Sequence, residues 1–131
     1  MNFEFNYQID TANKILVCES EGEISDIIEV EHLMKNIIKL AGKNQLKNVV
    51  LDVTQLKISC SSFALSNLLI DAKEAKLLGD IKIARIVSSE HNNQYLIGEI
   101  ASKLQLAIKN FETRSEAVLW LLFNKLPERD M

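Results

Sequence analysis

A short and almost uninterrupted apolar run near the middle of the chain constrains the fold most strongly. Residues 49–53 read VVLDV, a length typical of a strand, and mostly polar residues precede them. A strand with one face in water alternates apolar and polar residues, whereas a strand covered on both faces does not. Such covered strands occur mainly in parallel sheets, where crossover helices lie on the faces. The run therefore predicts a central strand with a parallel neighbour.

Apolar stripes with helical spacing precede and follow this run. The first stripe extends over residues 30–41, with Ser25 as its expected N-cap and Gly42 as its expected end. After a predicted loop at residues 54–60, a second stripe extends over residues 65–78. The central strand is therefore expected to connect two amphipathic helices.

The rest of the sequence extends this alternation in both directions. Residues 3–9 alternate apolar and polar positions and residues 15–18 are apolar, which predicts an N-terminal hairpin. Four patterns follow the second helix: a strand at 81–87, a helical stripe at 96–104, a short strand at 106–108 and a capping box at 113–116 that opens a last helix.

The resulting order, β-β-α-β-α-β-α-β-α, predicts an α/β fold. We expect a mixed, largely parallel sheet of four to five strands with an N-terminal hairpin and about four helices. The chain has 131 residues without a break in composition, and its 47% apolar and 25% charged residues suffice for one ordinary core. We therefore predict a single domain over residues 1–126 and a frayed tail at 127–131.

Composition and charge exclude several function classes. The formal net charge is -3 and no basic run occurs, which argues against nucleic-acid binding. The N-terminus lacks a signal-peptide pattern, and no apolar stretch approaches about 18 residues, so a cytoplasmic protein that does not span a membrane is expected. Cys18 and Cys60 are too far apart for a zinc half-site and are expected to be free, buried thiols.

Three segments, in their order and spacing, resemble a known family. They are GEIS at 22–25, the central strand at 49–53 with Leu56 and a serine pair after it, and FETRSEAV at 111–118. Together they resemble the STAS domains of anti-sigma-factor antagonists, in particular the SpoIIAA-like branch that is also described as STAS/SEC14-like. The resemblance implies a STAS-like fold and a non-enzymatic regulatory module that binds a protein partner such as a kinase or an anti-sigma-like regulator.

The resemblance also implies a regulatory phosphorylation site. In antagonists of this family the first serine of the pair accepts a phosphoryl group from a partner kinase, and that position falls on Ser61, with Ser62 beside it. Cys60 stands where the family has an aspartate and Phe63 where it has a glycine, so a kinase would meet a different charge and a bulky ring. Physically, a helix N-terminus favours an added phosphate. The alternative is that Ser61 or Ser62 only caps the helix.

A second hypothesis from another class is a small apolar or lipid-like ligand, which the SEC14-like resemblance suggests. The side chains that could line a pocket between sheet and helices are Phe63, Leu65, Leu69, Tyr95, Leu96 and Trp120. The alternative is that these residues form ordinary core, because apolar side chains at helical spacing usually do.

Enzymatic function has little support in the sequence. Phosphate-binding glycine loops, zinc-hydrolase motifs and nucleophile elbows are all absent, so we expect no catalytic residue, no metal and no cofactor. Cys60 at a helix start could have a lowered thiol pKa. However, the chain has only His32, which we expect at the surface, and His91 as histidine bases, and neither adjoins Cys60 in sequence.

Polar segments after two parallel strands indicate where a functional face would lie. Ligands of open α/β sheets bind at the carboxyl ends of the strands. The expected face combines the serine pair with five further residues: Ser59, Cys60, Ser88, Ser89 and His91. The hairpin would also leave an exposed sheet edge, through which a homodimer could form.

Overall fold

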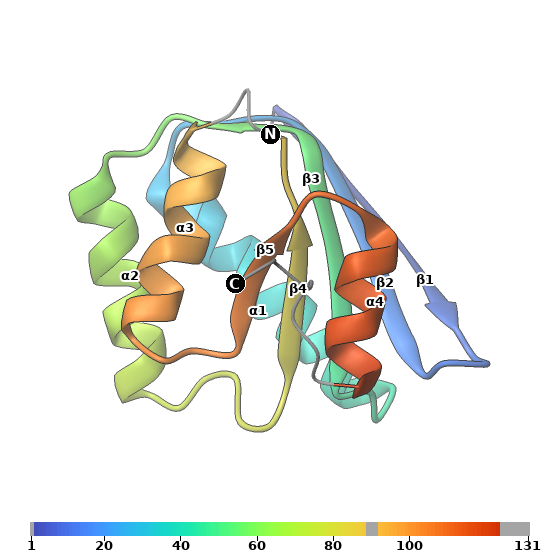
Figure 1. Ribbon diagram of the computed structural model, residues 1–131. Helices are drawn as coiled ribbons and strands as arrows, with labels where there is room; N and C mark the ends of the chain where they lie inside the picture. Colours follow the sequence, from blue (N-terminus) through green and yellow to red (C-terminus); the bar gives the residue numbers. More distant parts are fainter. Residues whose placement is uncertain (1, 89–91, 124–131) are drawn as a thin grey trace, which may run out of the picture.

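Five strands form one mixed sheet whose spatial order follows the sequence, β1-β2-β3-β4-β5 (Figure 1). The computed structural model describes residues 2–88 and 92–123. An antiparallel hairpin of β1 (Phe3–Asp10) and β2 (Ile15–Ile24) is followed by three strands, each parallel to its predecessor: β3 (Asn48–Ile58), β4 (Lys82–Ile86) and β5 (Ile108–Phe111). The predicted mixed, largely parallel sheet with an N-terminal hairpin is confirmed.

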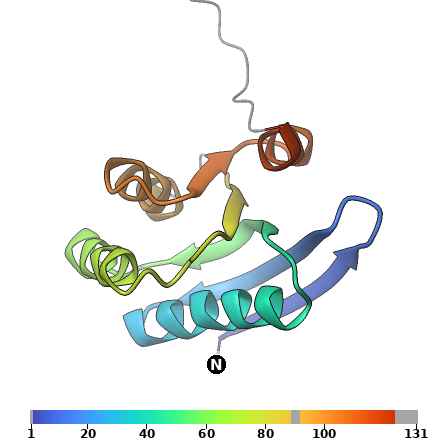
Figure 2. The same cartoon turned by 90° about the horizontal axis from the view of Figure 1, so that it is seen from below.

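Four helices cover the two faces of the sheet unequally, as Figure 2 shows. α1 (Ile27–Lys43), α2 (Ser62–Glu74) and α3 (Asn92–Lys103) lie on one face, and α4 (Arg114–Phe123) lies on the other. Successive right-handed crossovers that move across the sheet in one direction leave their helices on the same face. The first three helices connect such neighbouring strands, whereas α4 follows the last strand.

The core consists of two clusters, one on each face. The larger cluster lies between the sheet and α1, α2 and α3, and the smaller lies under α4 around Phe111 and Trp120. The central strand contributes to both, because Val49 and Leu51 belong to the larger cluster and Val50 to the smaller. β3 is therefore covered on both faces, as its apolar sequence predicted.

Several predicted boundaries were wrong because long-range pairing extends the strands. β3 continues to Ile58 through the segment that we predicted as a loop, since its polar second half pairs with β2 after a register shift at Glu19/Glu21. β2 in turn continues to Ile24, past Gly22, whose φ of 117° and close approach to the Asn2 backbone leave no room for a Cβ atom. Because β2 continues to Ile24, α1 begins only at Ile27, later than predicted.

The caps of α1 also differ from the prediction. Asp26, and not Ser25, is the N-cap, and its carboxylate accepts a hydrogen bond of 2.9 Å from the Ile28 amide. The helix passes Gly42 and ends at the C-cap Asn44, whose side-chain amide donates to the Leu40 carbonyl at 2.8 Å.

The C-terminal elements follow the predicted order with shifted limits. α3 begins at Asn92, ahead of the predicted stripe, and β5 begins at Ile108 instead of residue 106. The predicted capping box is present, since the Glu116 amide donates to Thr113 Oγ1 at 3.2 Å before α4. The predicted tail at 127–131 lies outside the described residues, and no helix within the described ranges is long and apolar enough to cross a membrane.

Candidate functional site

The connection between β3 and α2 is short and presents its hydroxyl groups to solvent. Ser61 is the N-cap of α2, because its hydroxyl accepts a hydrogen bond of 3.1 Å from the Ala64 amide. The side chains of Ser59, Ser61 and Ser62 are exposed, whereas Cys60 between them is buried. The capping role predicted for the serine pair therefore falls on Ser61, which remains accessible.

Two neighbouring elements hold this loop in place. On one side the Ser59 amide donates to the Ile24 carbonyl of β2 at 2.9 Å. On the other side the side-chain amide of Asn93 in α3 donates, through Nδ2, to the carbonyls of Ile58 at 2.8 Å and Cys60 at 3.1 Å. Hydrogen bonds from both sides fix the backbone, so the exposed serines occupy a defined position.

The start of α1 lies next to this loop, and its carboxylates give the surroundings of the loop a negative charge. Burial raises the pKa of the Cys60 thiol, and the nearby carboxylates of Asp26 and Glu29 in α1 raise it further. A thiol surrounded in this way stays protonated at neutral pH. The possibility of a lowered thiol pKa at Cys60 therefore does not hold, because burial and the nearby carboxylates both raise it. Both cysteines are free and buried, as predicted.

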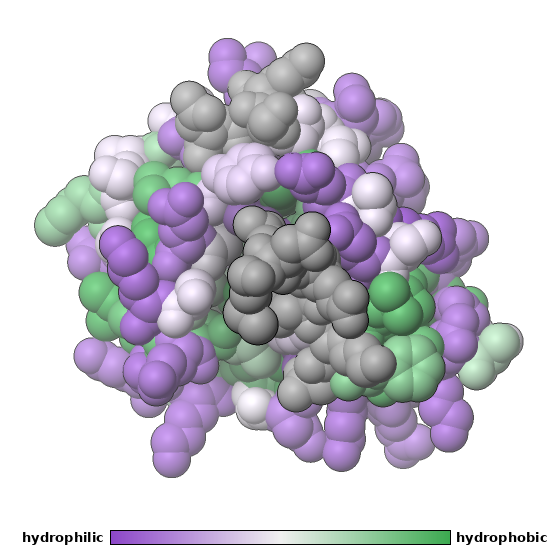
Figure 3. Space-filling model, viewed as in Figure 1, coloured by the Kyte–Doolittle hydropathy of each residue, from purple (hydrophilic) through white to green (hydrophobic). Residues whose placement is uncertain are grey.

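Large apolar side chains are exposed in the first turns of both helices. Phe63 of α2 has 75% of its surface exposed and Ile28 of α1 has 57%. In Figure 1 the chain leaves the upper end of β3 and enters α2, and Figure 3 shows an apolar group among hydrophilic side chains over the start of α2. We call this surface the α1/α2 end; it consists of Asp26, Ile28, Ser59, Ser61, Ser62 and Phe63.

The second polar segment of the predicted face follows β4. The pairing of β4 with β3 ends at Asp52 and Ile86, and in Figure 1 the chain after β4 continues toward the same end of the sheet as the loop that leaves β3. Ser88 is half-buried, while Ser89 and His91 lie outside the described residues. The structure therefore places four predicted residues, Ser59 to Ser62, at the carboxyl end of β3 and the start of α2.

A buried polar network, which sequence reasoning missed, lies behind the loop. Arg85 of β4 is 4% exposed, and its Nη1 donates to the Gln94 carbonyl at 2.6 Å and to Asn110 Oδ1 at 2.7 Å. Its Nη2 donates to Gln94 Oε1, and Gln94 Nε2 donates to the Leu56 carbonyl at 2.9 Å. The only sequence signal was a charged residue inside the apolar strand at 81–87.

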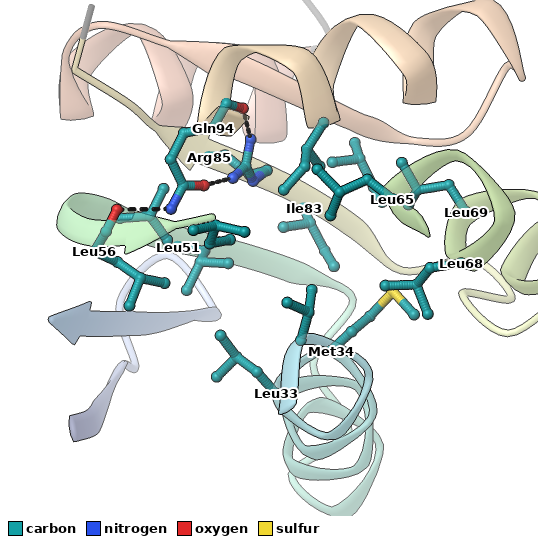
Figure 4. A pocket seen from close by; sticks show the side chains of 15 residues that line it. Leu33, Met34, Leu51, Leu56, Leu65, Leu68, Leu69, Ile83, Arg85 and Gln94 are labelled. Atoms are coloured by element: carbon teal, nitrogen blue, oxygen red, sulfur yellow. Dashed lines mark hydrogen bonds between the residues drawn. The ribbon is translucent and has the colours of Figure 1, made fainter. Parts of the chain in front are cut away.

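This network forms the polar end of an interior pocket of about 60 Å³ (Figure 4). Arg85 and Gln94 are the only polar side chains among its lining residues, and the others are aliphatic or Met34. In Figure 4 these two lie at one end, and Leu33, Met34 and Leu68 lie away from them. The pocket lies between the sheet and α1, α2 and α3.

The predicted lining of this pocket was only partly right. Leu65 and Leu69 line it, but Phe63 points into solvent and Trp120 packs on the opposite face of the sheet. Tyr95 and Leu96 pack against the larger cluster without lining the pocket. Apolar residues at helical spacing are expected to face the core. The spacing does not show which face of the sheet their helix covers.

No site for a metal ion is evident in the described part of the chain. Residues 2–88 and 92–123 contain no group of three or more His, Cys, Asp or Glu side chains that could hold one. His32 is exposed in the middle of α1, as expected.

Comparison with solved structures identifies the fold. An uncharacterised DUF3478-family protein with a SpoIIAA-like fold from Shewanella loihica aligns over 92% of this chain and 94% of its own, at a TM-score of 0.54 and 17% identity. An anti-sigma factor antagonist from Mycobacterium paratuberculosis aligns over 90% and 94%, at 0.56 and 14%. The phosphorylated form of SpoIIAA, the Bacillus cell fate determinant, aligns over 88% and 96%, at 0.50 and 15%.

These likenesses confirm the SpoIIAA-like fold that the sequence resemblance implied. At such low identity they describe the architecture alone. No family model matches the sequence, and no curated protein matches it.

Proposed function

We propose that this chain is a non-enzymatic, cytoplasmic regulatory module whose α1/α2 end binds a protein partner. The observation that carries the proposal is the exposure of Phe63, an aromatic side chain 75% in solvent beside three exposed hydroxyls on a hydrogen-bonded loop. Exposed aromatic residues on a preformed surface are frequent anchors of protein interfaces. The similarity to an anti-sigma factor antagonist supports a partner of the kinase or anti-sigma-like class.

A photo-crosslinking experiment in the native cells tests this proposal. A photoreactive phenylalanine analogue replaces Phe63 in one variant and Phe123, which is 64% exposed at the end of α4, in the matched control. We expect a discrete protein adduct from position 63 and none of that mass from position 123. Equal adducts from both positions, or none from position 63, would contradict the proposal.

Phosphorylation of Ser61 is the regulatory step that this site favours. The Ser61 hydroxyl is exposed, and the amide groups of the first turn of α2 would stabilise a phosphate carrying about -1.5 to -2 charges. Because Asp26 and Glu29 lie near the loop, the phosphate would add to an already negative surface. A phosphate there would weaken binding of an acidic partner and strengthen binding of a basic one.

Mapping phosphorylation sites by mass spectrometry, after incubation with extract of the native cells, tests this step. We expect modification at Ser61 that the Ser61→Ala variant lacks. Sustained absence of phosphate from both Ser61 and Ser62 in an extract that phosphorylates other proteins would rule the step out.

The interior pocket supports a second candidate function, the binding of a small ligand. Its volume of about 60 Å³ exceeds the space for one water but is well below the roughly 150 Å³ cavity that admits benzene. A ligand of few heavy atoms therefore fits better than a lipid chain. Native mass spectrometry of protein purified from its own cells would reveal a bound small molecule.

A second copy of this chain, paired through β1, is a further candidate partner. β1 is one of the two edges of the described sheet, and exposed edges can pair with a second copy. Light scattering after size exclusion gives the mass directly, and a concentration-independent monomer would exclude a homodimer.

A further inference from the structure

The argument starts from the charge of a buried side chain. Arg85 is 4% exposed, and its burial lowers its pKa to about 9. A guanidinium with this pKa still carries its positive charge at neutral pH. Buried charges are normally paired with an opposite charge, because removing an ion from water is costly.

No described carboxylate neutralises this charge. The three hydrogen bonds that Arg85 makes to described residues all end on neutral oxygens of Gln94 and Asn110. The ion pairs between described residues are Lys35 with Glu31 and Lys47 with Asp80, both at the surface. Since a guanidinium has five N–H donors, the described residues use three and leave capacity for a further acceptor.

The surroundings of the guanidinium select the kind of anion. Beyond Arg85 and Gln94 the pocket is lined by aliphatic side chains, among them Leu51, Leu68 and Ile83. An anion with an apolar tail would satisfy both ends, whereas inorganic phosphate or sulfate would leave the apolar end empty. The guanidinium fork matches a carboxylate with two parallel hydrogen bonds.

We propose that the interior pocket binds a carboxylate of two or three carbon atoms, with its carboxylate group on Arg85 and its short hydrocarbon end against the aliphatic side chains of the lining. This inference rests on the second candidate function and is independent of partner binding at the α1/α2 end. It also gives the Arg85, Gln94 and Asn110 network a role. Gln94 and Asn110 hold the guanidinium in one orientation, and the ligand supplies the missing negative charge.

Titration of the ¹⁵N-labelled full chain with acetate, followed by NMR, tests the proposal. Acetamide, a neutral molecule of nearly the same shape, is the matched control. We expect saturable shifts of the Gln94 and Asn110 side-chain amides with acetate, and at least tenfold weaker binding of acetamide. Absence of saturable acetate binding, or equal affinity for acetamide, would overturn the proposal.

Two variants separate the site from the stability of the fold. Arg85→Met removes the charge, and the double variant Val30→Ile and Val53→Ile adds methyl groups to the lining while keeping Arg85. Each should lower acetate affinity at least tenfold, and the double variant keeps the test valid if Arg85→Met does not fold. Unchanged affinity in a folded double variant would contradict the assigned pocket.

The two levels of the proposal fail in different ways. One alternative outcome is a neutral apolar molecule that copurifies with the protein and resists displacement by acetate. This result would support a ligand-binding function of the pocket and overturn the proposal that the ligand is a carboxylate. Phe63→Ala should leave acetate binding unchanged, because its side chain lies outside the pocket. A loss of acetate binding in that variant would overturn the independence of the two sites.

Discussion

The two faces of the sheet accommodate positive charge in opposite ways. Under α4, the ammonium groups of Lys82 and Lys109 lie 5.1 and 6.0 Å from the ring centroid of Trp120, and both lysines are half-buried. Their long side chains cover the indole while the charges stay near water. On the opposite face Arg85 is buried beside a pocket.

This difference shows which features the packing of a helix on this sheet does not require. Lys82 and Arg85 belong to the same strand, yet only one of them is withdrawn from water. The α4 face shows that a stable layer forms here without a buried charge. The face of α1, α2 and α3 therefore carries features that packing alone does not require, and we expect the two faces to respond differently to substitution.

The largest loss of stability is expected on the α4 face. Trp120→Ala removes a side chain that is 4% exposed and packs on Phe111 with ring centroids 5.6 Å apart. We expect a loss of about 3–5 kcal/mol in the free energy of unfolding, measured by urea denaturation. Acetate binding should persist in the folded fraction. A loss below about 1 kcal/mol would contradict the structural role of this face.

Arg85→Met should destabilise the protein less. The substitution removes an expensive buried charge but leaves oxygens of Gln94 and Asn110 without their donor. We expect a net loss of about 1–3 kcal/mol in urea denaturation. Lys82→Met, the control on the same strand, should lose less than about 1 kcal/mol. Equal losses would mean that the two faces do not differ.

The pH dependence of stability should reveal the buried charge. Burial lowers the folded-state pKa of Arg85 from 12.5 to about 9, so above about pH 9 the unfolded chain binds more protons than the folded one. Stability then rises with pH for this group, because the cost of burying its charge disappears. Comparison of the wild type with Arg85→Met in denaturation experiments from pH 7 to 10 isolates the effect. A difference that stays constant across this range would refute it.

Ser61→Ala should have a moderate effect that Ser62→Ala lacks. Ser61 caps α2 through the Ala64 amide, and loss of such a cap costs about 1 kcal/mol. Ser62 is the first helical residue and is exposed, so its substitution should cost less than about 0.5 kcal/mol. Thermal denaturation distinguishes the two. The reverse order would assign the cap to Ser62.

The smallest effect on stability is expected at the proposed interface. Phe63→Ala alters a side chain that is 75% exposed, so unfolding should change by less than about 0.5 kcal/mol in urea denaturation. Partner binding should nevertheless be lost. A destabilisation above about 1 kcal/mol would show that Phe63 serves packing.

The order of elements was predictable because each one has its own local pattern. The apolar run at 49–53 indicated a covered central strand, and its neighbours β2 and β4 are both parallel to it. The second half of β3 was not predictable, since its polar residues become a strand only by pairing with β2 across a register shift. Local propensity does not contain that information.

The candidate site was predictable in part for the same reason. Residues 59–62 are consecutive in the sequence, so their clustering follows from sequence order. The network of Arg85, Gln94 and Asn110 joins a strand, a helix and another strand, and only the three-dimensional arrangement brings these residues together. The pocket behind the loop was therefore predictable as apolar core but not as a site with a buried charge.

Hydrogen–deuterium exchange of the chain in complex with the partner crosslinked from position 63 tests most directly which face carries the function. We predict slower exchange over residues 26–29 and 59–66, at the start of α1 and α2, and no change over 114–123 in α4. Slower exchange confined to α4, with the α1/α2 end unchanged, would contradict the account.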